Sequence, residues 1–199
     1  MPLTIYGTSR SRAFRVLWMA TELELDFVHE PLSWQVCASH PPYLALNPSG
    51  TIPALDDNGF VLSESLAINL YLAQKAGQLW PSDLQQQARV HQWTLWVATT
   101  LETPYTEWAA HTYWSPEAAR EPAVAAAAAT RMRRPLDRLE LALTQAPYLL
   151  GEHFSVADLN VVSVIAMVYK FEPEQRPALG DWLARCRARP AFRQAGKLP

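Results

Sequence analysis

A cluster of hydroxyls and arginines follows the first apolar segment of the chain. The sequence "TSRSR" occupies residues 8–12, directly after "LTIYG" and at the start of a helical apolar pattern. The first turn of a helix offers unpaired N–H groups and the positive end of the helix dipole. A hydroxyl of Thr8, Ser9 or Ser11 at this position either caps the helix or stabilises an anion such as a thiolate. The residues alone leave both interpretations open.

The stretch "NPSGTIPAL" at residues 47–55 joins a turn to a short strand. A branched residue before proline at such a place is a candidate for a cis peptide bond, here between Ile52 and Pro53. A cis bond would leave the Ile52 N–H and C=O free to pair with an extended ligand backbone, as a strand edge does. The alternative is an ordinary proline at the start of a strand.

The stretch "LSESLAI" at residues 62–68 begins another helix. The exposed N–H and hydroxyl of Ser65 suit a ligand carboxylate, and Glu64 suits an ammonium group. Together they could receive an α-amino acid group. The structural alternative is a cap by Ser63, with Glu64 favoured by the helix dipole.

The stretch "YTEWAAHTYW" at residues 105–114 gathers aromatic side chains near the end of a long helical pattern. Tyr105, Trp108, His111 and Trp114 could form one wall of an apolar ligand site or part of the core. His111 has no Cys or second His at ligand spacing, so we predict no metal site.

Ser155 and Asp158 in "FSVADL" have the spacing of a capping box at the start of an apolar helix. We expect Asp158 to serve folding rather than catalysis.

Composition excludes several classes of function. The 199 residues carry a formal net charge of −2, so nothing indicates a nucleic-acid partner. No apolar run approaches the roughly 18 residues of a membrane span, and "MPLTIYGTSR" does not read as a secretion signal. Cys37 and Cys186 form no CxxC motif and fit a reducing compartment. We therefore predict a cytoplasmic protein that binds no membrane.

The first part of the chain predicts an α/β domain over residues 1–76. A strand at 3–6, a helix from Arg12 and a strand at 27–32 form a unit whose two strands should be parallel. Strands at 52–55 and 60–62, joined by "DDNG", predict an antiparallel hairpin. A helix over 63–77 follows.

After a linker at residues 77–85 the strand signals vanish. Helical patterns cover residues 84–112, 123–143 with a kink expected at Pro135, 155–169 and 178–190. The pattern predicts an all-α domain over residues 86–199, in which the strongly apolar segment 155–169 is the central helix.

Four stretches in this order and spacing carry a family resemblance: "LTIYGTSRSRAFRVLW", "LALNPSGTIPAL", "LSESLAINLYL" and "YLLGEHFSVADL". The chain resembles the cytosolic glutathione transferases over nearly its whole length, in particular bacterial members related to the theta, phi and nu-like groups. The resemblance implies a thioredoxin-like N-terminal domain, an all-α C-terminal domain and a homodimer. It also implies glutathione as co-substrate.

The resemblance assigns roles to the motifs. It implies that Ile52 and Pro53 hold the cysteinyl backbone of glutathione, and that Glu64 and Ser65 hold its γ-glutamyl group. A hydroxyl near the start of the first helix would stabilise the thiolate. Different classes of the family align differently in this loop, and the order of preference here is Ser11, then Ser9, then Thr8.

Two positions depart from the family pattern. Thr51 stands where members often have Lys or Gln, and Ser39 stands where phi-like members have Lys. Both positions normally help to hold the glycine carboxylate of glutathione or nearby backbone. His40, Gln35 or an arginine of the first cluster could substitute. The predicted glutathione site therefore also includes Thr51, His40 and Arg12.

The resemblance predicts a transferase that activates glutathione for attack on small hydrophobic electrophiles, typically in detoxification. Tyr105, Trp108, His111 and Trp114 would hold the electrophile. One alternative is a non-catalytic binding or regulatory protein of the same fold, like the stringent-starvation type. Another is a glutathione-dependent isomerase or dehalogenase. The isomerase is less favoured because "SRSRAF" does not match the zeta pattern "SSCxW".

Overall fold

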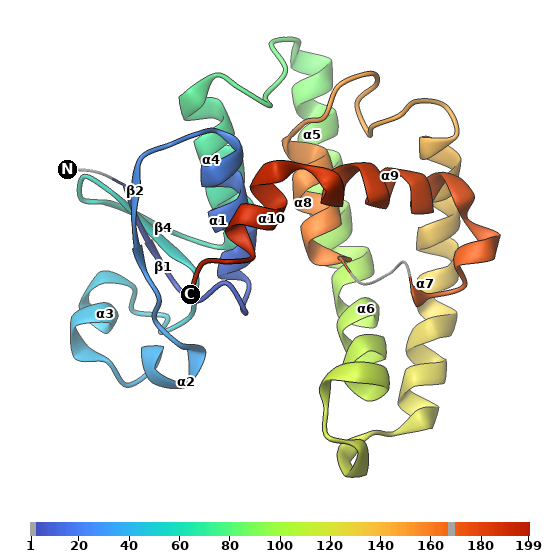
Figure 1. The fold of residues 1–199 in the computed structure, drawn as a ribbon, viewed down its shortest axis with the longest axis horizontal. Helices are drawn as coiled ribbons and strands as arrows, with labels where there is room; N and C mark the ends of the chain where they lie inside the picture. The colour runs from blue at the N-terminus through green and yellow to red at the C-terminus, as the bar shows by residue number, and fades with distance from the viewer. Residues whose placement is uncertain (1–2, 167–169) are drawn as a thin grey trace. The chain divides into compact units, whose positions relative to one another are not determined.

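The computed structural model describes residues 3–166 and 170–199 (Figure 1). The chain divides into two compact units, one of Met1–Pro81 with Arg187–Pro199 and one of Ser82–Cys186. The first holds a four-stranded mixed sheet and the second is all helical, which confirms the predicted fold class. The predicted boundary put the whole C-terminal segment in the helical domain, whereas its last residues group with the first unit.

The sheet of the first unit has the strand order β2-β1-β3-β4. β1 pairs parallel with β2 and antiparallel with β3, and β3 pairs antiparallel with β4. The predicted parallel pair and hairpin are therefore present. The strands are β1 (Leu3–Tyr6), β2 (Phe27–Glu30), β3 (Ala54–Asp57) and β4 (Phe60–Ser63). β2 is shorter than predicted because Pro31 has no N–H to extend the ladder.

Alternation along the strands gives the sheet two different faces. Helices α1 (Ala13–Glu22) and α4 (Ser65–Ala76) pack together and cover one face (Figure 1). Ile5 and its partner Leu55 are fully buried there. The other face carries Tyr6 and Ala54, which pack with Cys37 and Tyr43. These last two come from the short helices α2 (Trp34–Cys37) and α3 (Pro41–Leu46).

Helix α10 (Pro190–Ala195) packs against α1. The ring of Phe192 lies edge-on to Phe14 and Trp18, at centroid distances of 5.2 and 5.0 Å. The Arg189 guanidinium donates to the Glu22 carboxylate at the end of α1. These contacts explain why the end of the chain belongs to the first unit.

The second unit contains five α-helices among the described residues. They are α5 (Leu84–Trp96), α6 (Glu102–Ala109), α7 (Pro122–Leu143), α8 (Val156–Val164) and α9 (Pro177–Ala188). The predicted single helix over 84–112 is interrupted, because π-helical turns occupy Val97–Leu101 and Ala110–Trp114. α7 continues through Pro135. Residues 167–169 of the predicted central helix lie outside the described residues.

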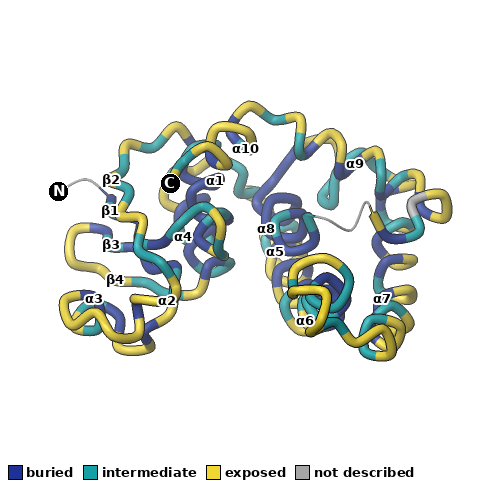
Figure 2. Tube along the Cα trace, turned by 60° about the horizontal axis from the view of Figure 1, so that its bottom comes forward, coloured by how far each residue is buried: buried dark blue, intermediate teal, exposed yellow. Residues whose placement is uncertain are grey.

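Helix α8 is buried along almost its whole length (Figure 2). The predicted capping box at its start is present. The Asp158 carboxylate accepts hydrogen bonds from the Ser155 N–H and hydroxyl at 3.0 and 2.9 Å. It also accepts from the Leu149 N–H and the Trp182 indole N–H, both at 2.9 Å. One carboxylate therefore joins the start of α8 to the preceding loop and to α9.

A buried carboxylate at the end of β3 predicts a pH dependence of stability. Hydrogen bonds from Lys75 and Tyr71 lower the pKa of Asp57 below its ordinary value of 3.8. A lowered folded-state pKa gives stability that is present above pH 3.8 and is lost as the pH falls towards the folded-state pKa. Replacement of Lys75 by Met should therefore lower the free energy of unfolding at neutral pH, with a difference from wild type that shrinks at acidic pH.

Urea unfolding at a series of pH values measures this difference. Lys197, which is exposed on the C-terminal tail, provides the control, because Lys197→Met should give no such pH-dependent difference. A Lys75→Met difference that stays constant between neutral and acidic pH would show that the ion pair is not its source.

Candidate functional site

A close approach of three segments forms the centre of the candidate site. Gly7, after β1, has a φ of +123°, a conformation that side chains disfavour. A Cβ at this position would lie 2.7 Å from the Ala13 Cβ and 3.2 Å from the Ile52 Cβ. Glycine thus lets the loop after β1 lie directly against both the start of α1 and the segment before β3.

The Ser11 hydroxyl lies at the first turn of α1. It accepts a hydrogen bond from the Ala13 N–H at 3.1 Å and donates to the Thr8 carbonyl at 2.7 Å. Ser11 therefore lies where the helix dipole favours a negative charge. A hydroxyl that accepts one hydrogen bond is polarised and becomes a better donor in another.

The other two hydroxyls of the loop have different surroundings. The Ser9 hydroxyl donates to the Leu198 carbonyl at 2.5 Å, and the Ser9 N–H donates to the Pro199 carbonyl at 2.8 Å. Ser9 therefore fastens the C-terminal tail. The Thr8 hydroxyl is half-buried and makes no hydrogen bond within residues 3–166 and 170–199.

The peptide bond between Ile52 and Pro53 is cis. Two hydrogen bonds to the Thr51 carbonyl fix the turn before this bond. Their donors are the Tyr43 hydroxyl at 2.5 Å and the Asn47 side-chain amide at 2.8 Å. In the described part of the chain, neither the N–H nor the C=O of Ile52 has a hydrogen-bond partner. The Ile52 backbone groups are therefore available to a ligand.

Helix α4 begins at Ser65, and its cap is Glu64 with a φ of 70°. The alternative cap, Ser63, is wrong because Ser63 is the last residue of β4 and pairs with Ala54. The buried Ser65 hydroxyl accepts from the Arg15 guanidinium at 3.2 Å. Arg15 thus joins the start of α4 to α1, and the site is continuous from the loop after β1 to Ser65.

The residues predicted to hold the glycine end of glutathione have exposed positions. Arg12 lies at the start of α1, and His40 lies just before α3. The Thr51 hydroxyl lies 2.9 Å from that of Ser49. All three residues lie in the first unit, and their side chains are accessible to a ligand.

Comparison with known proteins identifies the family. Residues 10–75 match the model of the glutathione S-transferase N-terminal domain, and residues 101–190 match that of the C-terminal domain. Glutathione S-transferase 3 of Zea mays is 32% identical over 97% of this chain and 92% of its own length. The chain belongs to the glutathione S-transferase family.

Further relatives of this family are bacterial. Glutathione S-transferase GstB of Escherichia coli is 27% identical over 99% of each chain. The crystal structure of a theta-class glutathione S-transferase from Xanthomonas axonopodis pv. citri, with glutathione bound, is 33% identical and has a TM-score of 0.90. That likeness covers 100% of this chain and 99% of the other.

The second unit contains the four residues predicted to hold the electrophile, namely Tyr105, Trp108, His111 and Trp114. Tyr105 and Trp108 on α6 are buried, and their ring centroids lie 6.2 Å apart. Trp114 is half exposed, and its ring stands edge-on to Tyr105 at 5.9 Å. The His111 ring accepts a hydrogen bond from the Glu121 N–H at 3.0 Å. The structure therefore brings the three aromatic side chains together, while His111 faces the start of α7.

The structure adds residues to the site that sequence reasoning did not assign to it. Arg15 was given no binding role from the sequence, although a charge on the apolar face of α1 is a signal for a buried partner. The contact of Leu198 and Pro199 with Ser9 has no local signal, because it joins the two ends of the chain.

Across residues 3–166 and 170–199, no group of three or more His, Cys, Asp or Glu side chains could hold a metal ion. No helix in these ranges combines the length and apolar character that a bilayer crossing requires.

Proposed function

We propose that this chain is an active glutathione transferase that binds glutathione on its first unit and activates the thiol for attack on small hydrophobic electrophiles. The observation that carries the proposal is the continuous arrangement of Ser11, the free Ile52 backbone groups and Ser65. Each offers the hydrogen-bonding group that a different part of an extended tripeptide requires. Family membership and the glutathione-bound relative support the same ligand.

The tripeptide would lie along the candidate site in one direction. The backbone of its cysteine pairs with the N–H and C=O of Ile52, beside Pro53. Its γ-glutamyl carboxylate binds the start of α4 at Ser65, and its ammonium binds Glu64. The glycine carboxylate lies towards Thr51, His40 and Arg12, where the family's lysine is missing.

Thiol activation is the chemical task of Ser11. A thiol of this type has a pKa of about 8.5, so little thiolate exists at neutral pH. When the thiolate is present, the Ser11 O–H turns from the neutral Thr8 carbonyl to the charged sulfur, because a charge-assisted hydrogen bond is stronger. The N-terminus of α1 adds to this effect. Stabilising the anion lowers the thiol pKa and raises the concentration of the nucleophile.

The electrophile would bind against the aromatic residues of α6 and the turn that follows. The half-exposed Trp114 offers apolar ring surface, which the buried rings of Tyr105 and Trp108 support, and His111, which faces the start of α7, offers a polar group. The thiolate attacks the electrophilic carbon and the leaving group departs as an anion, so the product is a thioether. A conjugation assay with glutathione and chlorodinitrobenzene tests this step. Absence of product, with glutathione still binding, would favour the non-catalytic binding protein instead.

Replacement of Ser65 by Ala tests the γ-glutamyl subsite. It should raise the dissociation constant of glutathione about tenfold, because a hydrogen bond to a charged group contributes roughly 1.5 kcal/mol. Calorimetric titration measures the effect. The matched control is Ser63→Ala, two residues earlier on β4, which should bind glutathione like the wild type. Equal affinities for Ser65→Ala and wild type would remove Ser65 from the site.

We also propose that the protein is a cytoplasmic homodimer that acts in detoxification. Cys37 and Cys186 are both buried and neither forms a disulfide in the described part of the chain, which agrees with a reducing compartment. Light scattering on the purified chain tests the dimer, and cell fractionation tests the location. A monomer at micromolar concentration would contradict the dimer, and recovery outside the cytoplasmic fraction would contradict the location.

A further inference from the structure

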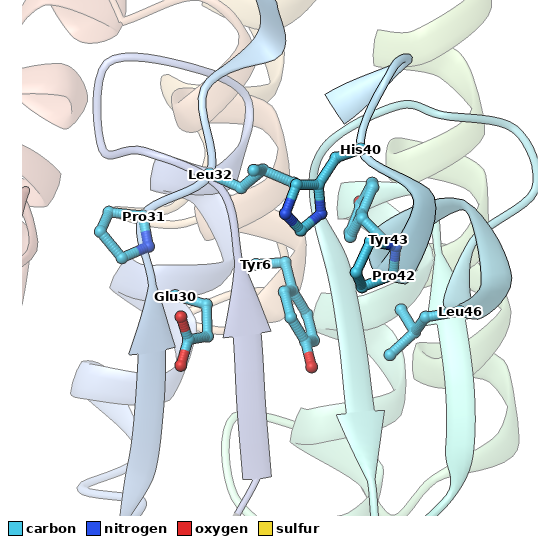
Figure 3. A pocket seen from close by; sticks show the side chains of 8 residues that line it. All are labelled: Tyr6, Glu30, Pro31, Leu32, His40, Pro42, Tyr43 and Leu46. Atoms are coloured by element: carbon cyan, nitrogen blue, oxygen red, sulfur yellow. The ribbon is translucent and has the colours of Figure 1, made fainter. Parts of the chain in front are cut away.

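A cavity lies on the face of the sheet that α1 and α4 do not cover. It has a volume of about 310 Å³, at the lower end of the range of small-molecule sites. Figure 3 shows its lining, in which Tyr6 and Glu30 face a group of side chains from the segment 40–46. The lining residues are Tyr6, Glu30, Pro31, Leu32, His40, Pro42, Tyr43 and Leu46.

Two polar groups of this cavity lie side by side. Tyr6 and Glu30 are register partners at the ends of β1 and β2, so their side chains lie on the same face of the sheet. In Figure 3 the oxygen atoms of both extend in the same direction from the strand ends. Within the described ranges, neither the Tyr6 hydroxyl nor the Glu30 carboxylate has a hydrogen bond or ion pair. Both groups remain available to an occupant.

The electrostatic environment of these groups is negative. Desolvation, followed by the charges of Asp56 and Glu30, raises the pKa of the Tyr6 phenol. The phenol therefore stays neutral and offers a hydroxyl beside the Glu30 carboxylate. The lining contains no Lys or Arg, and its one basic side chain is His40. A cation is favoured here, and an anion such as glutathione is not.

The rest of the cavity is apolar and aromatic. The rings of Tyr6 and Tyr43 lie 5.6 Å apart and are inclined by 51°. Leu32 and Leu46 pack against the same cluster, and two prolines complete the wall. Such a wall accepts a flat apolar ring, and aromatic faces also attract a cation.

We propose that this cavity binds a small arylalkylamine in its ammonium form. The ammonium group lies against the Glu30 carboxylate and the Tyr6 hydroxyl, and the ring packs against Tyr43, Leu32 and Leu46. The cavity shares His40 with the proposed glutathione site, but its ligand is a cation, whereas glutathione is an anionic tripeptide. This assignment does not depend on transferase activity.

Three probes that share a naphthalene group but differ in charge test the proposal. They are naphthylmethylamine, naphthylmethanol and naphthoate. Calorimetric titration of the full chain at low ionic strength should give the tightest binding for the amine. The neutral alcohol should bind about fivefold more weakly, because a solvent-accessible ion pair contributes up to roughly 1 kcal/mol. Naphthoate should bind most weakly. Equal affinity for the amine and the alcohol would overturn the proposal.

A pair of glutamate variants locates the binding site. Glu30→Gln should remove the preference for the amine over the alcohol while leaving the alcohol's own affinity unchanged. The matched control is Glu24→Gln, because Glu24 is exposed in the same unit but does not line the cavity. Glu24→Gln should keep the full preference. A preference that survives in Glu30→Gln, or is lost equally in both variants, would contradict this site.

Discussion

Replacement of Ser11 by Ala should lower kcat/KM for glutathione conjugation by about 100-fold, the usual loss for one hydrogen bond donor to a developing or bound anion. The reason is that the Ser11 hydroxyl is held at the N-terminus of α1, where it accepts from Ala13 and can donate to the thiolate. The pH profile should shift to higher pH, since the thiol loses a group that stabilises its anion. Steady-state kinetics across a pH series measure both effects.

The neighbouring hydroxyls provide matched controls for Ser11. Ser9→Ala should keep conjugation within about twofold of wild type, since the Ser9 hydroxyl is used by the Leu198 carbonyl; its cost should be a stability loss of about 1 kcal/mol. Thr8→Val removes the one hydroxyl of the loop that has no hydrogen bond in the described ranges. A 100-fold loss in Thr8→Val, with normal kinetics in Ser11→Ala, would transfer the catalytic role to Thr8.

Stability must be measured beside activity for Ser11→Ala. The hydroxyl also caps the first turn of α1, and loss of a cap costs about 1 kcal/mol. A loss of this size leaves the protein folded at room temperature, where stabilities are about 5–15 kcal/mol. A rate loss that tracks unfolding on urea titration would therefore count against a role in the reaction.

Replacement of Asp158 by Ala should lower the free energy of unfolding by about 3–5 kcal/mol, the range for removing one partner of a buried charged network. Asp158 is fully buried and accepts four hydrogen bonds. Its loss leaves the donors of Ser155, Leu149 and Trp182 without a partner in an apolar environment. Urea unfolding with two spectroscopic probes measures the change.

Two further variants separate this network from general effects on the second unit. Asp181→Ala changes an exposed aspartate next to Trp182 and should stay within about 0.5 kcal/mol of wild type. Trp182→Phe removes one donor and keeps the other three, so its cost should be smaller than that of Asp158→Ala. If Asp158→Ala were no more destabilising than Asp181→Ala, the carboxylate would not hold α8, α9 and the preceding loop together.

The strands and most helices could be predicted because their signals are local. The "DDNG" turn indicates the hairpin of β3 and β4, and the apolar spacing after Arg12 indicates α1. The two π-helical turns that divide the predicted helix over 84–112 were not predictable, since one extra residue per turn hardly changes the apolar pattern. The placement of α10 on the first unit depends on ring contacts with Phe14 and Trp18, which no local pattern shows.

The part of the candidate site that could be predicted from the sequence also depends on local signals. Ile52 and Ser65 occupy fixed places in their motifs, so their positions just before β3 and at the start of α4 follow from the sequence. The hydroxyl cluster was ambiguous because Thr8, Ser9 and Ser11 all carry a hydroxyl group and lie in one short segment. Their difference comes from long-range contacts, above all the tail carbonyl that engages Ser9.

The pKa of the glutathione thiol bound to the wild-type protein tests the central claim most directly. An ultraviolet difference titration of the complex records the thiolate as the pH rises. We predict a pKa below the value of about 8.5 for an ordinary thiol, with a clear thiolate signal at neutral pH. A bound thiol that titrates at the same pH as free glutathione, or no complex at millimolar glutathione, would contradict the proposed function.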